Sequence, residues 1–303
     1  MNEPEVSLPY IDFGTFLRRY FPEQKVQKST LTAGFSCPTR DGSMGKGGCT
    51  YCNNKSFSPN YAVKLKSITE QIDEGIAFFR RKYPEMRYLA YFQSYTNTYG
   101  EVADCIAKYE EALSHPDVVG LIIGTRPDCM PQPLLDYLSE LAKRTFLLVE
   151  YGVESTCDRS LERIQRGHSW QCSVDTIHRT YEAGILVGAH LILGLPGESR
   201  EEMLQHADRL SSLPITTLKI HQLQIIRGTI MAGEYLRNPE DFHLFTEEEY
   251  IELIVDFVHR LRSDIVLERF VSQSPPALLL APRWGWKNHE FTAKIRRALE
   301  KDS

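Results

Sequence analysis

The sequence contains no run of eighteen apolar residues, so we expect no helix that crosses a membrane. The first residues, MNEPEVSLPYIDFG, are acidic and lack both the basic and the apolar segments of a secretory signal. The seven cysteines are odd in number and do not have the spacing of a disulfide framework, which favours a reducing compartment. These absences together predict a cytoplasmic protein with no membrane partner.

Positive charge is also scarce. Lys and Arg number 35 against 40 Asp and Glu, which gives a net charge of −5. A protein of this charge does not attract polyanions as a whole, so any contact with nucleic acid must use a local basic surface. The hydrophobic content of 42% and the length of 303 residues suit a globular protein with a sizeable core, in one large domain or two small ones.

Three of the seven cysteines gather in the segment CPTRDGSMGKGGCTYC, residues 37–52. Cys49 and Cys52 form a C-x-x-C pair, and Cys37 precedes Cys49 with eleven residues between them. Four glycines in that interval would let the backbone wrap closely around a ligand. No second C-x-x-C or C-x-x-H is present, whereas a structural zinc site needs four closed ligands. Three thiolates suit an iron–sulfur cubane that keeps one iron open, and zinc or plain structural thiols are the alternatives.

Six segments are predicted to be strands, each followed by a helix or a loop: residues 31–35, 87–93, 118–123, 146–153, 186–193 and 216–223. Capping boxes, in which Ser or Thr is followed three residues later by Glu, predict helix starts at Ser67, Ser199 and Thr246. This alternation predicts parallel strands joined by right-handed crossovers, in a barrel or in an open sheet. Ligands bind at the carboxyl ends of the strands in both folds, and the first strand would place Cys37 there.

Polar residues at the later strands are candidates for chemistry. Lys219 and His221 alternate with Ile220, so they share one face of the sixth strand. If that face lines the barrel, both are candidate substrate contacts or proton donors. Arg269, on an added strand at residues 265–271, could reach the same opening. We take Lys219, His221 and Arg269 as the candidate catalytic residues.

The C-terminal stretch combines aromatic and basic residues. From Arg283 to Lys301 there are six Lys and Arg against two Glu. Trp284 and Trp286 are either stacking platforms for RNA bases or ordinary core anchors. The candidate phosphate contacts are Arg283, Lys287, Lys294, Arg296 and Arg297.

Several motifs together resemble a known family. They are CPTRDG, GGCTYCN, AYFQSYTNTY, GTRPDC, RGH, LILGLPGE and KIHQLQIIRGT. The chain resembles the radical S-adenosylmethionine (SAM) superfamily, in the branch of the elongator catalytic subunit, and is most similar to bacterial proteins of the YtqA/YhcC type. The resemblance covers about residues 20 to 285. The eleven-residue interval after Cys37 departs from the usual C-x-x-x-C-x-x-C spacing, but long first intervals occur in the elongator branch.

The resemblance implies the α/β fold class, as a partial (β/α)6 parallel barrel of radical SAM type with a small C-terminal α+β extension. The expected division is an N-terminal arm at residues 1–28, the barrel at residues 29–235 and the extension at residues 236–303.

The resemblance also implies a set of residues around SAM. Arg166, in the RGH motif, would lie near the SAM carboxylate. Glu154 stands where related enzymes often have Gln, and His190 where coproporphyrinogen-oxidase-like relatives have an acidic residue that binds the ribose. The guanidinium of Arg126 could hold a carboxylate with two hydrogen bonds, or it could make a loop contact with Asp128. The expected cofactor-binding residues are Tyr51, Arg126, Glu150, Glu154, Arg166, His190 and Gly194.

The function that the resemblance implies is a cytoplasmic enzyme that uses a [4Fe-4S] cluster and SAM, with an electron donor such as flavodoxin or ferredoxin. Its implied partner is tRNA, in which it would convert 5-carboxymethylaminomethyluridine at the wobble position to aminomethyluridine. A radical SAM enzyme that acts on a small metabolite is one alternative. A non-enzymatic, zinc-stabilised RNA-binding module is the other, and the iron and sulfide content of the isolated protein separates it from the first two.

Overall fold

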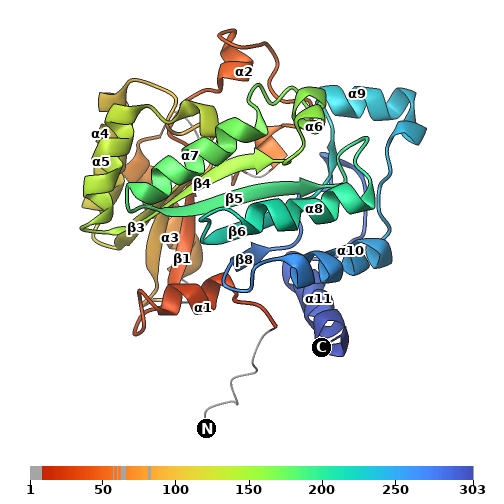
Figure 1. Cartoon of the computed structure of the whole chain (residues 1–303). Coiled ribbons are helices and arrows are strands. Elements are labelled where there is room, and N and C mark those ends of the chain that lie inside the picture. Colours follow the sequence, from red (N-terminus) through yellow and green to blue (C-terminus); the bar gives the residue numbers. More distant parts are fainter. Residues whose placement is uncertain (1–8, 57, 60, 63–65, 81–82, 303) are drawn as a thin grey trace.

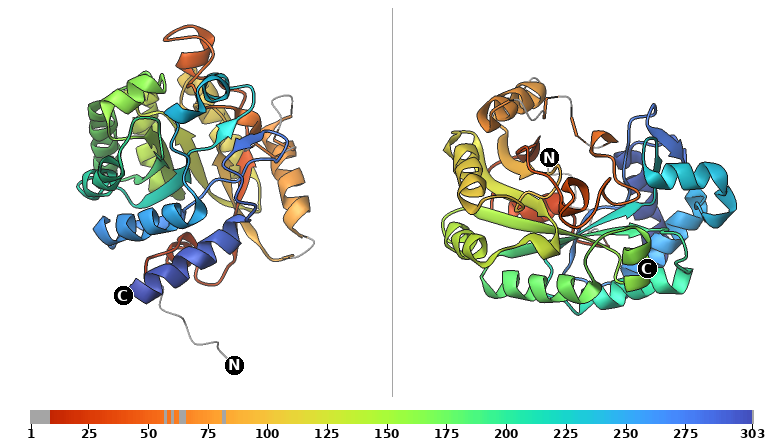
Figure 2. Two further views of the ribbon diagram at one scale, coloured as in Figure 1. Left: turned by 90° about the vertical axis from the view of Figure 1, so that its right-hand side faces the viewer. Right: turned by 90° about the horizontal axis from the view of Figure 1, so that it is seen from above.

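Seven parallel strands form the curved sheet at the centre of the protein, in the order β1-β2-β3-β4-β5-β6-β8. The computed structural model describes residues 9–56, 58–59, 61–62, 66–80 and 83–302. Viewed from above, the sheet is curled with helices around its outer side, so the architecture is a parallel α/β half-barrel (Figures 1 and 2). The strands are β1 (Val26–Leu31), β2 (Arg87–Phe92), β3 (Val118–Thr125), β4 (Phe146–Glu154), β5 (Leu186–Leu193), β6 (Thr217–Gln222) and β8 (Val266–Arg269).

The connections between successive strands carry the helices. The longer ones, placed between or after the strands, are α3 (Ile68–Arg80), α4 (Val102–Ser114), α5 (Gln132–Ala142), α7 (Trp170–Glu182), α8 (Arg200–Ser211), α10 (Glu247–Arg260) and α11 (Asn288–Asp302). The shorter ones are α1 (Phe13–Arg18), α2 (Pro38–Asp41), α6 (Asp158–Arg163) and α9 (Ile230–Arg237), with 3₁₀ turns at Asn54–Ser56, Pro127–Cys129 and Pro239–Asp241. A separate antiparallel ribbon pairs β7 (Ile225–Ile226) with β9 (Leu279–Ala281). The three expected capping boxes are all formed, at Ser67, Ser199 and Thr246.

Alternation along the strands separates an apolar outer face from a layered interior. On β4, Leu147, Val149, Tyr151 and Val153 belong to the apolar cluster that the helices cover. The alternate positions face inward and change in character along the strand. Phe146 and Leu148 pack with α1 in a separate apolar cluster, and Glu150, Gly152 and Glu154 follow toward the carboxyl end. The barrel interior therefore has an apolar base, a charged middle and a polar open end.

The first strand is the element whose predicted position is wrong. It covers Val26–Leu31 and not residues 31–35, so its first three residues fall within the expected N-terminal arm. The apolar run at residues 31–35 is interrupted by Gly34, which has φ +78° and ends the extended conformation. Cys37 consequently follows a loop, not the strand itself. The other five strands lie within two residues of their predicted bounds.

The C-terminal extension also contributes to the sheet. The added strand predicted at residues 265–271 is present as β8, which pairs in parallel with β6 and makes the sheet seven strands wide, one more than expected. The first eight residues of the expected arm lie outside the described part of the chain. Within that described part, no helix has the length and apolar character that crossing a membrane requires.

Candidate active site

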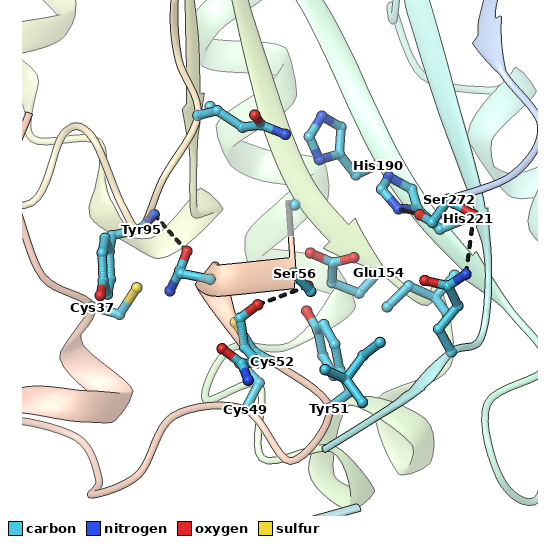
Figure 3. Close-up of a pocket in the computed structure, with 18 of the residues that line it drawn as sticks. Cys37, Cys49, Tyr51, Cys52, Ser56, Tyr95, Glu154, His190, His221 and Ser272 are labelled. Carbon is cyan, nitrogen blue, oxygen red and sulfur yellow. Dashed lines mark hydrogen bonds between the residues drawn. The ribbon is translucent and has the colours of Figure 1, made fainter. Parts of the chain in front are cut away.

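A pocket opens at the carboxyl ends of the strands, bounded by two chemically different walls. Cys37, Cys49 and Cys52 line one side, and His190 and His221 line the other (Figure 3). Glu154 and Tyr51 lie between the two walls in the same view. Further lining residues come from the ends of β2 and β3 and from the loop after β8: Gln93, Tyr95, Thr96, Thr125, Arg126, Ser272, Gln273 and Ser274.

The cysteine loop is held in shape by its own backbone. Cys37 is the N-cap of α2, and the amide of Cys52 donates to the carbonyl of Cys49 at 3.0 Å, which closes a tight turn around the C-x-x-C pair. Between these two cysteines, Thr50 donates to Ile164 O at 3.0 Å and accepts from Met231 N at 2.9 Å. The loop is thus anchored to the end of α6 and to the start of α9.

Arg40 and Gly48 pack against each other beneath the C-x-x-C turn. Gly48 has φ +88°, and a Cβ there would lie 2.7 Å from the Arg40 guanidinium carbon. Only glycine fits this close approach without displacement of the arginine. Arg40 in turn donates through Nη2 to Cys52 O at 2.8 Å. A cation is therefore fixed directly beside the thiol pair.

Two further polar groups contact the thiols. The Thr96 hydroxyl donates to Cys37 Sγ at 3.1 Å, and Arg166 Nη1 donates to Cys49 Sγ at 3.7 Å. Burial raises the pKa of the Cys52 thiol to about 11, and the neighbouring Cys49 adds to that shift. Donors and cations that point at sulfur stabilise thiolate charge once a metal replaces the protons.

Arg166 and Glu154 form a pair at the end of β4. Arg166 is buried and donates to Gly152 O, with its Nη2 also 3.7 Å from Glu154 Oε1. Gly152 makes this possible, because a Cβ there would lie 2.5 Å from Arg166 Nη2 and 2.6 Å from Glu154 Oε1. Glu154 itself has φ +68°, a strained conformation for a residue other than glycine, next to a register shift in the β4–β5 pairing. Burial, with the carboxylate of Glu154 next in effect, raises the pKa of Tyr51.

Arg126 makes the loop contact and also keeps a free donor. Its Nε and Nη2 donate to the Asp128 carboxylate at 2.9 and 2.8 Å. Its Nη1 is buried and has no hydrogen-bond partner among the described residues. Since Arg126 lines the pocket, this remaining N–H is a donor suited to a bound ligand.

Glu150 and Lys219 lie below the pocket, in the charged middle of the barrel. Glu150 is 1% exposed and accepts from Lys28 at 2.9 Å, from Lys219 at 2.7 Å and from His190 Nε2 at 2.9 Å. Glu268 bonds the same two lysines, at 2.6 Å to Lys28 and 2.9 Å to Lys219. The structure therefore places Glu150 and Lys219, which we expected to bind cofactor and to act in catalysis, in an internal ion network. His190 connects that network to the pocket.

His221 and Arg269 belong to the wall opposite the cysteines. Arg269 Nη2 donates to the His221 ring at 3.0 Å, and the Ser272 hydroxyl lies 2.5 Å from His221 Nδ1. Burial first, and the guanidinium of Arg269 second, hold the pKa of His221 well below its usual range. The structure thus brings the side chains of two of the three candidate catalytic residues together at the pocket, whereas the Lys219 side chain bonds Glu150 and Glu268 in the ion network.

Gly194 and His168 take positions outside the pocket lining. Gly194 has φ +93° and would meet the ring of Phe245 at 3.1 Å if it carried a Cβ, so its turn packs against the extension. His168 lies in a shallower cleft between the cysteine loop and α6, and burial, followed by the charge of Arg166, lowers its pKa to about 3.

Comparison with known families assigns the superfamily of the chain. The model of the radical SAM superfamily matches residues 44–210, more than half of the chain, and that of the radical SAM C-terminal domain matches residues 215–301. The chain belongs to the radical SAM superfamily. This membership makes it an enzyme of that class and sets aside the zinc-stabilised binding module.

Individual relatives agree with this assignment. The chain is 38% identical over 272 residues to protein YhcC of Escherichia coli (strain K12), covering 89% of this chain and 85% of YhcC. It is 34% identical over 284 residues to the uncharacterized protein YtqA of Bacillus subtilis (strain 168), covering 94% and 87%. A tRNA uridine(34) acetyltransferase of Methanocaldococcus infernus is 29% identical over 154 residues, 48% of this chain and 27% of that protein.

A solved structure supports the fold over nearly the whole chain. The archaeal Methanocaldococcus infernus Elp3 with an N-terminal deletion superposes with a TM-score of 0.68 at 19% identity. The match covers 92% of this chain but only 63% of that one, so our chain spans less than two thirds of the archaeal protein. The shared part shows a radical SAM fold with the C-terminal extension in place.

Radical SAM enzymes bind a [4Fe-4S] cluster and SAM, and both are the cofactors of this chain. The residues present fit these groups. The three thiols line one pocket, which suits a cubane, in which each thiolate binds its own iron. Arg40, Arg166 and Arg126 surround the thiols with positive charge, which suits an anionic cluster and a SAM carboxylate.

Some lining residues were not singled out from the sequence. Thr96 contacts Cys37, Gly152 makes room for Arg166, and Ser272 bonds His221. The polar run SYTNTY directly after β2 was a usable signal for Thr96, since polar residues at a strand end of such a fold face the ligand. Gly152 and Ser272 had no comparable local signal.

Proposed function

We propose that this radical SAM enzyme modifies the wobble uridine of tRNA, by removing the carboxymethyl part of 5-carboxymethylaminomethyluridine to leave aminomethyluridine. Cys37, Cys49 and Cys52 would hold the cluster, and the cluster with SAM would supply radical chemistry that removes a hydrogen from the substrate. The two carbons of the carboxymethyl part would leave as glyoxylate, with SAM as the oxidant and a water molecule, added after the hydrogen is removed, as the source of the aldehyde oxygen. The protein positions the substrate between the two walls of the pocket and excludes water around the reacting atoms. The relationship to a tRNA uridine(34) acetyltransferase over 48% of the chain favours a uridine substrate.

The observation that carries the proposal is the set of groups across from the cysteines. His221, Arg269 and Ser272 offer hydrogen bonds and one positive charge to whatever enters beside the cofactors. A nucleobase presents hydrogen-bonding edges, and a carboxymethylamino substituent adds a carboxylate. Both features match this wall.

Unpaired cations at the pocket rim support an RNA substrate. Lys55 and Arg227 are exposed and directly follow lining residues of the pocket, Asn54 and Ile226. Arg283 is also exposed and donates to Leu279 O, in the strand that pairs with Ile226. The salt bridges formed by the described residues include none of these three cations. Asn53 donates to Arg227 O at 3.0 Å, and Arg227 N donates to Leu278 O at 2.8 Å, so these segments are joined at the β7–β9 ribbon. The phosphates that flank a nucleoside in the pocket would lie near this rim, and single-stranded RNA is bound by such basic grooves.

The helix that we expected to contact phosphates lies elsewhere. Figures 1 and 2 show α11 at the bottom of the molecule, whereas α2 and the cysteine loop are at the top. Lys294 pairs with Glu247, and Arg296 lies beside the Tyr10 hydroxyl. Trp284 stacks on Phe291 at 5.2 Å and is therefore a core anchor. Of the five expected contacts, we retain Arg283 for the rim.

Mass spectrometry of tRNA nucleosides from a deletion strain tests the reaction. We expect the carboxymethylaminomethyl nucleoside to accumulate and its aminomethyl descendants to disappear. An unchanged nucleoside profile would favour the alternative, a radical SAM enzyme that acts on a small metabolite. We also expect flavodoxin or ferredoxin to support turnover of the reconstituted protein as electron donor.

Salt-dependent tRNA binding tests the rim. In a plot of the logarithm of the binding constant against the logarithm of the salt concentration, each phosphate contact adds about −0.7 to −0.9 to the slope. Replacing Lys55 and Arg227 by Ala should flatten the slope by about 1.4 to 1.8 if each makes one contact. The matched control replaces Arg297 and Lys301 on α11, both exposed, and should leave the slope unchanged. The reverse pattern would place the RNA on the α11 side and contradict the rim.

A further inference from the structure

The wall opposite the cysteines contains a strand irregularity that turns two neighbouring side chains inward. In the β6–β8 pairing, Leu218 faces Leu267 and Lys219 faces Arg269, so Glu268 is an extra residue in β8. Neighbours on a regular strand point to opposite faces, but this bulge lets both Glu268 and Arg269 reach the interior. Glu268 bonds the lysines of the ion network, whereas Arg269 lines the pocket above it.

Arg269 differs from the other cations of the barrel interior. Lys28 and Lys219 are each held by two carboxylates, and Arg126 is bonded by Asp128. No salt bridge within the described chain involves Arg269, and its Nε is buried without a hydrogen-bond partner there. A partly buried guanidinium without a counter-charge is costly. The positive charge of Arg269 therefore calls for an anion that is not part of the described chain.

His221 orients this guanidinium but does not neutralise it. A guanidinium can only donate, and Arg269 Nη2 lies 3.0 Å from His221 Nε2 and 3.1 Å from Nδ1, so the ring is the acceptor in this contact. The Ser272 hydroxyl lies 2.5 Å from Nδ1 of the same ring. The depressed pKa of His221, caused first by burial and then by Arg269, agrees with a neutral ring. The positive charge of Arg269 therefore remains fully available to a ligand.

The loop after β8 is itself fixed in place. Gln222 donates to Ser272 O at 3.1 Å and accepts from Ser272 N at 2.5 Å. Gln224 also donates to Ser272 O at 3.1 Å and accepts from the Ser274 hydroxyl at 2.6 Å. These bonds fix the position of Ser272. Its hydroxyl contacts His221, and the His221 ring in turn contacts Arg269. Such an arrangement is preorganised for binding, because its donors do not have to be ordered by the ligand.

We propose that Arg269, oriented by His221 and Ser272, is a subsite for a carboxylate of the substrate. The wall holds one cation and otherwise neutral donors, which matches one negative charge better than a phosphate dianion. Arg166 and Arg126 line the cysteine side of the pocket, where we expect the SAM carboxylate, so we assign this subsite to the second reactant. For a nucleoside substrate the inference rests on the proposed function, and for a small metabolite the same subsite would bind its carboxylate.

Binding of paired RNA probes tests the subsite. One anticodon stem-loop carries 5-carboxymethylaminomethyluridine, and the other carries its methyl ester, which lacks the carboxylate charge. We expect the reconstituted enzyme with SAM to prefer the acid by about tenfold to a hundredfold, since a charge-assisted bond is lost in the ester. Arg269→Gln should reduce this preference to about one, and Arg269→Lys should keep part of it. Ser272→Ala should lower it less than Arg269→Gln, because it removes only the support of His221.

Controls separate this subsite from folding and from SAM binding. The matched variant is Arg237→Gln. Arg237 is exposed on α9 and, among the described residues, donates to Gly233 O of its own helix, so this variant should bind both probes as the unmodified enzyme does. SAM affinity, cluster absorbance and melting temperature should be the same in Arg269→Gln. An undiminished preference for the acid in Arg269→Gln would overturn the proposal.

A second probe decides the proposal if neither RNA binds, which would be a failure of the proposed function. N-methylglycine carries the same carboxymethylamino group, and its amide is the counterpart that lacks the carboxylate. Saturation-transfer nuclear magnetic resonance should then show binding of the acid that depends on Arg269 and is absent for the amide. If the acid binds equally well to Arg269→Gln, or binds to neither protein, the subsite is refuted independently of the RNA.

Discussion

Replacing Glu150 by Gln should destabilise the protein strongly, because it unbalances the ion network in the middle of the barrel. Glu150 and Glu268 offset Lys28 and Lys219, and Glu150 is 1% exposed with bonds of 2.7 and 2.9 Å to the two lysines. At an effective dielectric constant of about 20, each such ion pair has a gross Coulomb energy of about 6 kcal/mol, much of it offset by desolvation. Removing one partner of a buried pair typically costs about 3–5 kcal/mol, so we expect a loss of that size in the free energy of unfolding.

Urea unfolding of the anaerobically purified protein, followed by circular dichroism, measures this loss. The informative comparison is with the double variant Glu150→Gln, Lys219→Met, which restores the balance of charge because Lys28 and Glu268 still pair at 2.6 Å. We expect the double variant to be more stable than Glu150→Gln alone. A loss below about 1 kcal/mol in the single variant, or simple addition of the two effects, would refute the reasoning.

The same network predicts a dependence on pH. Burial alone would raise the pKa of Glu150, but the charges of Lys219 and Lys28 outweigh it and hold the pKa well below the usual value. A carboxylate with a depressed pKa contributes stability above its unfolded pKa and loses it as pH falls toward the folded pKa. The difference in stability between the unmodified protein and Glu150→Gln should therefore be full near neutral pH and shrink below about pH 4.5. A difference that stayed constant in acid would contradict the assignment.

Three further outcomes are expected at the cysteine wall. Cys49→Ala should prevent reconstitution of the cluster and abolish SAM cleavage. Cys105→Ala, at a buried site outside the pocket lining, should retain both. A cluster that survives Cys49→Ala would reject the ligand assignment. Arg166→Ala should weaken SAM binding in calorimetry by about tenfold or more while the iron and sulfide content stays unchanged, and equal affinity would exclude the role. Gly152→Ala should weaken SAM binding as well, because its Cβ would displace Arg166 and Glu154. Normal affinity together with a normal melting temperature would show that these side chains can move aside.

Local signals in the sequence determined much of the framework. The strands from β2 to β6 were predictable because continuous apolar runs mark strands that are buried on both faces, and the capping boxes marked three helix starts. The cysteine spacing and the motifs with which it occurs led to the family and to both cofactors. The position of β1 was not predictable from its apolar content, because its place is set by pairing with β2 and by the turn at Gly34.

Only the tertiary structure decided how deep each polar side chain lies in the barrel. Alternation showed that Lys219 and His221 share a face, but two residues of strand separate them by roughly 6.6 Å along the chain. That step puts Lys219 among carboxylates and His221 at the pocket. The bulge that turns Arg269 inward, and the location of α11 far from the cysteines, likewise depend on strand pairing and helix packing between distant segments. Sequence periodicity fixes the face of a strand, whereas register and packing fix which neighbours that face meets.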